Sequence, residues 1–246
     1  MNVGAVPEVT ALVLGSRGGA RLNRALASVA WTGDRIVLDP AGRLGEEPLP
    51  PSVRRLVDAA RACEVTRAPW LLLLQEDEVT PPALAAAVGA EVRGATPRMA
   101  YRIPRQLRAL GATLRVGAPV RLARGPGARL RLTAALTVEL RAASGRPGRL
   151  AAHLEAWGAP SLAEAVQDVE AEAAAYAELL RAQGVRPRLH RLMVAPIVAA
   201  GGLLSARAAA RLPWARWSLA VLAGYRPAVA YAKLWEMRRL GASTPR

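Results

Sequence analysis

Three short apolar runs separated by helix-like segments constrain the fold of this 246-residue chain most strongly. Each run ends in Gly, Pro or a polar cluster; the runs cover residues 9–15, 35–40 and 70–74. Apolar residues then recur at helical spacing over residues 21–31, 53–63 and 80–92. Strands that alternate with helices predict parallel strands joined by crossover helices. We therefore expect an α/β fold with a mostly parallel central sheet.

Polar residues follow two of these predicted strands. Asp39 ends the second run, and Gln75, Glu76, Asp77 and Glu78 follow the five apolar residues of the third. Ligands of parallel sheets bind beyond the carboxyl ends of the strands, so both positions are candidates for a site. The alternatives are that Asp39 is a turn residue before a proline and that the acidic cluster is a solvated turn at a helix start.

The pattern becomes helical after residue 160. Ser161 and Glu164 form a capping box for a helix expected over residues 161–183, whose apolar stripe includes Leu162 and Val166. The apolar run at 192–204 is about a dozen residues long, short of the ~20 needed to span a bilayer. Trp, Tyr and Arg are interleaved after it, which is typical of a membrane-surface segment. We predict one region over 1–160 and a helical, membrane-surface region over 161–246.

The charge is strongly segregated along the chain. Residues 93–149 contain 13 arginines and one acid, Glu139, whereas residues 150–180 contain six acids and no base. Residues 181–246 contain 12 basic residues and one acid, Glu236. A nucleic-acid-binding protein is the alternative suggested by the net charge of +15. Segregated charge, 4% aromatic residues and no recognisable nucleic-acid module favour a partner other than nucleic acid.

The cysteine and histidine counts exclude several kinds of site. Cys63 is the single cysteine, so neither an intramolecular disulfide nor a cysteine zinc cluster is possible. The two histidines, His153 and His190, are far apart in the sequence and cannot form a multi-His metal site. The first residues contain no basic segment before an apolar one, so we expect no signal peptide and a cytoplasmic location.

The order of the motifs resembles that of family 2 glycosyltransferases with the GT-A fold. Within that family, the closest similarity is to the small bacterial branch that builds lipopolysaccharide core and related surface glycans. The similarity covers nearly the whole chain, and four stretches carry it: residues 26–39, 70–84, 100–105 and 231–236. It implies a three-layer α/β sandwich that binds a nucleotide-diphospho-sugar and transfers the sugar, with inversion, to a glycan or glycolipid acceptor. The location it implies is the inner face of the cell membrane, as a peripheral protein.

The resemblance also implies roles for individual residues. Asp39, Gln75 and Glu76 would contact the donor, Asp77 and Glu78 would hold Mg²⁺ or Mn²⁺, and Glu139 would be the catalytic base or an acceptor contact. Oxygen ligands and a hard cation suit the charge that develops on a leaving diphosphate.

Several positions of the family pattern are occupied by other residue types. Gln75 stands where the metal motif has its first Asp, Val138 stands where the branch has a His, and Arg17 begins a stretch that is acidic in the family. These replacements support a second hypothesis, in which the chain is a glycosyltransferase-like protein that has lost catalysis and now binds or regulates.

Overall fold

A seven-stranded, mostly parallel sheet forms the centre of the protein. The computed structural model describes residues 5–45, 48–58, 61–94, 98–125, 127–132, 138–186, 188–205 and 213–242. The strand order is β12-β6-β9-β4-β1-β2-β3. Within it, β9 runs antiparallel to β4 and β6, and the other four pairings are parallel. The bounds are β1 (Val6–Leu14), β2 (Thr32–Leu38), β3 (Val53–Leu56), β4 (Trp70–Gln75), β6 (Ala100–Arg102), β9 (Val120–Arg124) and β12 (Gly148–Arg149).

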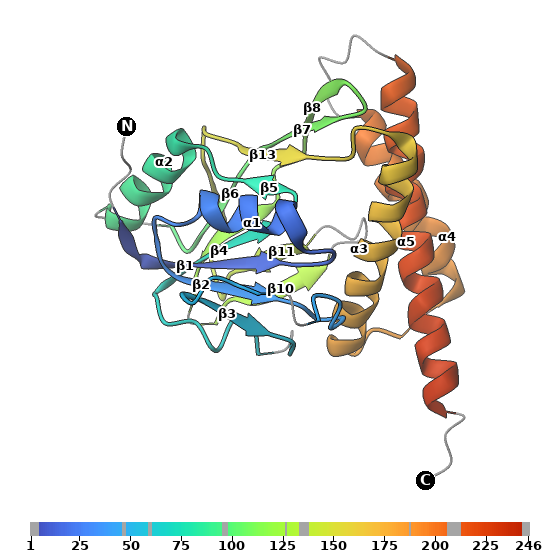
Figure 1. Cartoon of the computed structure of the whole chain (residues 1–246), viewed down its shortest axis with the longest axis horizontal. Coiled ribbons are helices and arrows are strands. Elements are labelled where there is room, and N and C mark those ends of the chain that lie inside the picture. The colour runs from blue at the N-terminus through green and yellow to red at the C-terminus, as the bar shows by residue number, and fades with distance from the viewer. Residues whose placement is uncertain are drawn as a thin grey trace.

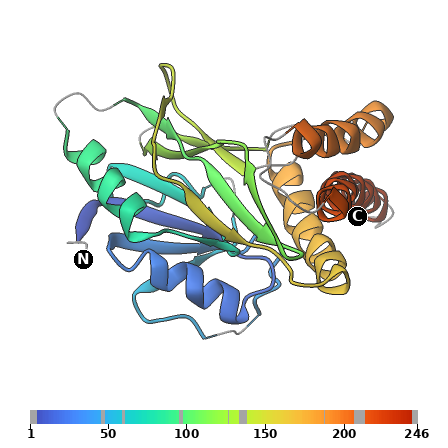
Figure 2. The same cartoon turned by 90° about the horizontal axis from the view of Figure 1, so that it is seen from above.

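Alternate residues of the central strands fill two different cores. Val13 and Leu74 face the core beneath helices α1 (Gly19–Ser28) and α2 (Pro82–Arg93). Leu12 and Leu73 face the opposite core, where they meet the middle of α3 (Leu162–Ala182). This alternation is the period of two that a buried strand imposes. The result is a three-layer sandwich with helices on both faces of the sheet (Figures 1 and 2).

Two smaller sheets flank the sandwich. One has the order β5-β13-β7-β8 and the other is the hairpin β10-β11. Their strands are β5 (Glu78–Val79), β7 (Arg105–Ala109), β8 (Ala112–Val116), β10 (Arg129–Leu132), β11 (Val138–Arg141) and β13 (Leu154–Trp157). The hairpin adds Val138 and Leu140 to the α3 side of the core.

Helices α4 (Leu189–Ser205) and α5 (Pro213–Ala242) lie outside α3, at the side of the sandwich that faces away from α2 (Figures 1 and 2). Ala230 and Leu234 of α5 join the core around α3, and Leu219 packs on the β7–β8 hairpin. The expected α/β fold class, with a mostly parallel central sheet and a C-terminal helical segment, is confirmed. The division at residue 160 stays a prediction. Helix α3, which belongs to the predicted second region, shares one core with the sheet.

Three local expectations differ from the structure. The helix expected over 53–63 begins instead as the edge strand β3, whose backbone pairs with β2, placing Val53 and Leu56 on opposite faces. Residues 59–60 of that segment lie outside the described residues. The helix expected from residue 80 has Pro81 as its N-cap, because the ring of Pro82 holds the preceding residue in extended conformation. Leu162 and Val166, which were expected to be in the α3 stripe, are exposed.

Candidate functional site

The four polar residues at the end of β4 and directly after it point alternately into the protein and into a cavity. Gln75 is the last residue of β4, Glu78 begins β5, and Glu76 and Asp77 form the turn between them. The carbonyl oxygen of Asp77 accepts a hydrogen bond of 2.8 Å from the amide of Trp157, so β13 fixes this turn. Because the turn is tight, neighbouring side chains leave it on opposite sides.

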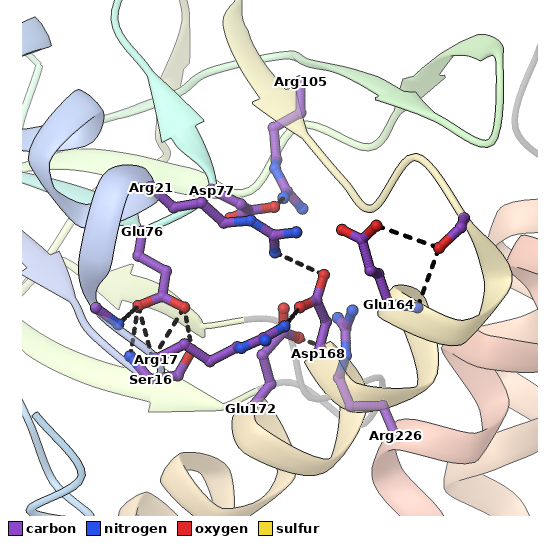
Figure 3. A network of polar contacts seen from close by, with 12 residues as sticks. Ser16, Arg17, Arg21, Glu76, Asp77, Arg105, Glu164, Asp168, Glu172 and Arg226 are labelled. Carbon is purple, nitrogen blue, oxygen red and sulfur yellow. Dashed lines mark hydrogen bonds and ion pairs between the residues drawn. The ribbon is translucent and has the colours of Figure 1, made fainter.

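The carboxylate of Glu76 occupies the loop between β1 and α1. It accepts hydrogen bonds from the backbone amides of Ser16 (2.8 Å), Arg17 (2.9 Å) and Gly18 (3.1 Å), and from the Ser16 hydroxyl (2.6 Å). Gly18 is the N-cap of α1, so the carboxylate lies at the positive end of that helix. Figure 3 shows Glu76 turned toward this loop. Glu76 therefore satisfies amides that would otherwise be available to an anion.

The carboxylate of Glu78 is completely buried between two arginines. Its Oε1 lies 2.5 Å from Nε of Arg105 and 2.7 Å from Nη2 of Arg121. Its Oε2 accepts a hydrogen bond of 2.8 Å from the backbone amide of Gln75. Arg121 is itself fully buried and donates to the carbonyl of Val138 at 2.9 Å. This arrangement ties β4, β9 and β11 together at the edge of the site.

Gln75 and Asp77 lie on the cavity side of the turn. Gln75 donates from Nε2 to the hydroxyl of Tyr176 (2.5 Å) and accepts from Nη2 of Arg105 (3.1 Å). Asp77 approaches the same guanidinium, with Oδ2 3.9 Å from Nη2 of Arg105. Burial raises the pKa of Asp77 to about 6, against the opposing charge of Arg105.

A cavity of about 380 Å³ unites these residues with Glu139, which follows them by more than sixty positions in the sequence. Glu139 is half-buried on β11, and the β10–β11 ladder places Arg131 opposite it. The cavity lies between the carboxyl end of β4, the β7–β8 hairpin and the three C-terminal helices. The structure thus brings together Gln75, Asp77 and Glu139 from the candidates that the sequence indicated.

Helix α3 contributes two acids that the sequence analysis did not select. Asp168 binds the guanidinium groups of Arg17 and Arg21, the second at 2.6 Å (Figure 3). Glu172 lies 2.7 Å from Nε of Arg226 on α5. Burial raises the pKa of Glu172 to about 7, although Arg226 acts in the opposite direction. The spacing of Asp168, Glu172 and Tyr176, four residues apart among alanines, is the signal that could have revealed this face.

Asp39 lies apart from this cavity. Its side chain is buried, and its two carboxylate oxygens accept hydrogen bonds from the amides of Arg43 (2.9 Å) and Leu44 (3.0 Å). These bonds close the turn after β2, as a short acidic side chain commonly does. The donor contact expected of Asp39 stays a prediction.

A second cleft, of about 690 Å³, adjoins the cavity and differs from it in charge. Arg105, Gly117, Ala118 and Gly202 line both spaces. The basic side chains along the second cleft are Arg105, Arg115, Arg149 and His153, and none of its described lining residues is acidic. We call it the arginine cleft. Planar guanidinium groups suit phosphate oxygens, and the ion pairs among the described residues include Arg105 but neither Arg115 nor Arg149.

The side chains expected to hold a divalent metal do not fit one. Glu78 is neutralised by two guanidinium groups, and the nearest cation to Asp77 is Arg105. Among the described residues, no group of three or more His, Cys, Asp or Glu side chains is arranged to hold a metal ion. A hard cation needs several free oxygen ligands, whereas the carboxylate oxygens of Asp77 and Glu78 face arginines of the chain itself.

Comparison with solved structures gives weak similarities, among them two structures of one protein. The first is to the crystal structure of S. aureus TarS 1–349, with a TM-score of 0.36 and 11% identity over 95% of this chain and 92% of that one. The second is to the crystal structure of S. aureus TarS, with a TM-score of 0.37 and 12% identity over 93% of this chain and 55% of that one. No protein-family model and no curated protein matches the sequence. At these values, the argument for function depends on the geometry of the cavity.

Proposed function

We propose that the protein is a glycosyltransferase that binds a nucleotide-diphospho-sugar and transfers the sugar, with inversion, to a glycan or glycolipid acceptor. The observation that carries the proposal is the convergence of Asp77 and Glu139 on one cavity at the carboxyl end of β4. Motif order singled out both residues from the sequence, and parallel sheets bind ligands at this edge.

Glu139 is the proposed general base. It faces the cavity, and the ion pairs found among the described residues do not include it, whereas Glu172 is paired with Arg226. In the reaction, the acceptor hydroxyl forms a bond to the anomeric carbon while its proton passes to the Glu139 carboxylate. The bond from that carbon to the diphosphate breaks, and the nucleoside diphosphate leaves with the electron pair.

The arginine cleft is the proposed position of the diphosphate. Arg115 and Arg149 are exposed on its walls, and Arg105 joins the cleft to the cavity. The guanidinium groups along this cleft would stabilise the negative charge that develops on the leaving group. The proposal therefore places no metal ion at Asp77 or Glu78 and gives Glu76 and Glu78 a positioning function.

Calorimetric titration with a panel of nucleoside diphosphates and nucleotide-diphospho-sugars tests this proposal. We expect one nucleotide to bind in the presence of a chelator, and the double variant R115Q/R149Q to weaken that binding at least about tenfold. E155Q is the matched control, because Glu155 on β13 pairs with Arg108 (3.7 Å) and is not among the residues that line either space. Failure of folded wild-type protein to bind any of these compounds would contradict the proposal.

One observation favours a second candidate, a glycosyltransferase-like binding or regulatory protein without catalysis. Glu76 fills the amide-lined loop at the start of α1, a position that suits a phosphate group. In that case, the protein would bind a nucleotide-sugar but would not transfer its sugar to any acceptor. Single-turnover measurements with a labelled donor and an extract of lipid-linked glycans distinguish the two candidates.

A further inference from the structure

Helices α4 and α5 carry a concentration of exposed apolar side chains. Ile197 is 69% exposed, Val221 68% and Trp217 61%. The other large apolar residues exposed on these two helices are Met193, Val194, Val198, Trp214, Tyr225 and Trp235. We call this set the outer face. On α5, Trp214, Trp217, Val221 and Tyr225 recur at intervals of three and four, so they lie along one side of the helix.

The inward sides of the same helices bury small residues and, on α5, large apolar residues such as Leu219 and Leu234. Ala195 and Ala199 of α4 and Ala215 and Ala220 of α5 are buried. The two helices pack so closely that a Cβ on Gly224 would lie 3.0 Å from the carbonyl oxygen of Pro196. A surface helix normally buries its large apolar side chains and exposes polar ones. Because α4 and α5 expose many large apolar side chains in addition to those they bury, the outer face is a candidate surface for a partner.

The charge of α5 indicates which partner that is. Arg216, Lys233, Arg238 and Arg239 lie on α5, and Glu236 is the one acid in residues 181–246. A second copy of the chain would bring two strongly basic surfaces together, and their repulsion disfavours self-association. An anionic lipid surface attracts the same charges and also accepts Trp, Tyr and aliphatic side chains at its interface.

We propose that the outer face of α4 and α5 docks the protein on the surface of an anionic lipid bilayer. No helix in the described part of the chain is long and apolar enough to cross a membrane, so the two helices would lie along the interface. This inference does not depend on the proposed transferase activity, because it rests on exposure and charge alone.

Docking in this way would place the cavity beside the lipid surface. The inward sides of α4 and α5 line the cavity through Ala199, Gly202, Leu222 and Arg226, while neighbouring positions on the same helices form the outer face. Figure 1 shows both helices at the side of the molecule that faces away from α2. An acceptor attached to a lipid would therefore have a short route to the cavity.

Sedimentation with sucrose-loaded vesicles tests the proposal on the full chain. We expect the protein to bind vesicles of phosphatidylglycerol and phosphatidylcholine, to bind pure phosphatidylcholine vesicles more weakly, and to be released by salt. The double variant W214A/W217A should lower the partition coefficient at least about tenfold, because it removes apolar surface that enters the interface. V57S is the matched control, since Val57 is 56% exposed and lies in sequence just after the edge strand β3.

Two results would overturn the proposal. One is wild-type protein that stays in solution with the anionic vesicles at low salt. The other is a stable dimer in analytical ultracentrifugation that W214A/W217A converts to monomer, because a second copy would then cover the outer face. Equal loss of vesicle binding in V57S would show that apolar residues in general, rather than the outer face, cause the association.

Discussion

The two sides of the turn after β4 use the same residue types in different ways. On the inner side, Glu76 and Glu78 are surrounded by amides and guanidinium groups of the chain itself. On the cavity side, Asp77 joins Glu139 at the boundary of an open space. A run of acids at a strand end therefore does not by itself define a metal site. What distinguishes the two sides is whether the protein supplies enough donors to satisfy each carboxylate.

The largest effect is expected from removing the inner carboxylate that two arginines share. E78A leaves Arg105 and Arg121 buried without their common partner, which should lower the free energy of unfolding by about 3–5 kcal/mol. Urea denaturation monitored by circular dichroism measures this change. A loss below about 1 kcal/mol would show that the inner side is not a structural anchor.

The cavity side should respond in activity rather than stability. E139Q removes the proposed base and should reduce turnover by about 10²–10⁴-fold, with the unfolding midpoint unchanged. The measurement is the rate of nucleoside diphosphate release once a donor and an acceptor are known. E155Q, which alters a carboxylate outside the cavity, should retain the wild-type rate. If both variants retain it, the assignment of Glu139 is wrong.

Glu76 offers a smaller test of the inner side. E76Q keeps the size of the side chain but loses the charge that the amides of Ser16, Arg17 and Gly18 stabilise, which should cost about 1.5–3 kcal/mol of unfolding free energy. Thermal unfolding measures this loss. If E76Q instead gained metal-independent nucleotide affinity, this loop would belong to the binding site, and the distinction between the two sides would fail.

The smallest effect is expected from the pH dependence of stability. Burial raises the pKa of Glu172 to about 7 in the folded protein, above the 4.5 of an unperturbed glutamate, so between pH 4.5 and 7 the folded state binds one proton more than the unfolded state. This contribution is fully present below pH 4.5 and is lost as the pH rises through 7. Glu172 should therefore make the wild type lose about 1–2 kcal/mol of unfolding free energy between pH 5 and 8.

The variant E172Q cannot titrate at this position, so its unfolding free energy should lack that contribution over the same pH range. Denaturation curves at several pH values compare the two proteins. A wild-type curve parallel to that of E172Q would contradict the assigned protonation of Glu172.

The sequence predicted three strands of the central sheet, β1, β2 and β4, because each contains a continuous apolar run. Residues 70–74 were predicted as a buried strand, and they form most of β4. The segment 53–63 was misread because Val53 and Leu56 fit both a helix and a strand over so few residues, and the exposed edge of β2 decides between them. Helix α2 begins at Pro82 rather than at residue 80, because Pro82 holds Pro81 in extended conformation.

The candidate site was predicted only in part. Asp77 and Glu139 were found from their place in the motif order, and both line the cavity. The separate environments of Glu76 and Glu78 depend on Ser16, Arg105 and Arg121, which are distant in sequence, so no local pattern contains them. Asp168 and Glu172 were not selected as candidates, although their spacing places them on one face of α3.

A crystal structure of the protein with a bound nucleoside diphosphate, grown in the presence of Mn²⁺, tests the central claim most directly. We expect a diphosphate against Arg115 and Arg149 in the arginine cleft, the sugar position facing Glu139, and no anomalous manganese signal at Asp77 or Glu78. A manganese ion bridging the diphosphate and Asp77 would contradict the central claim.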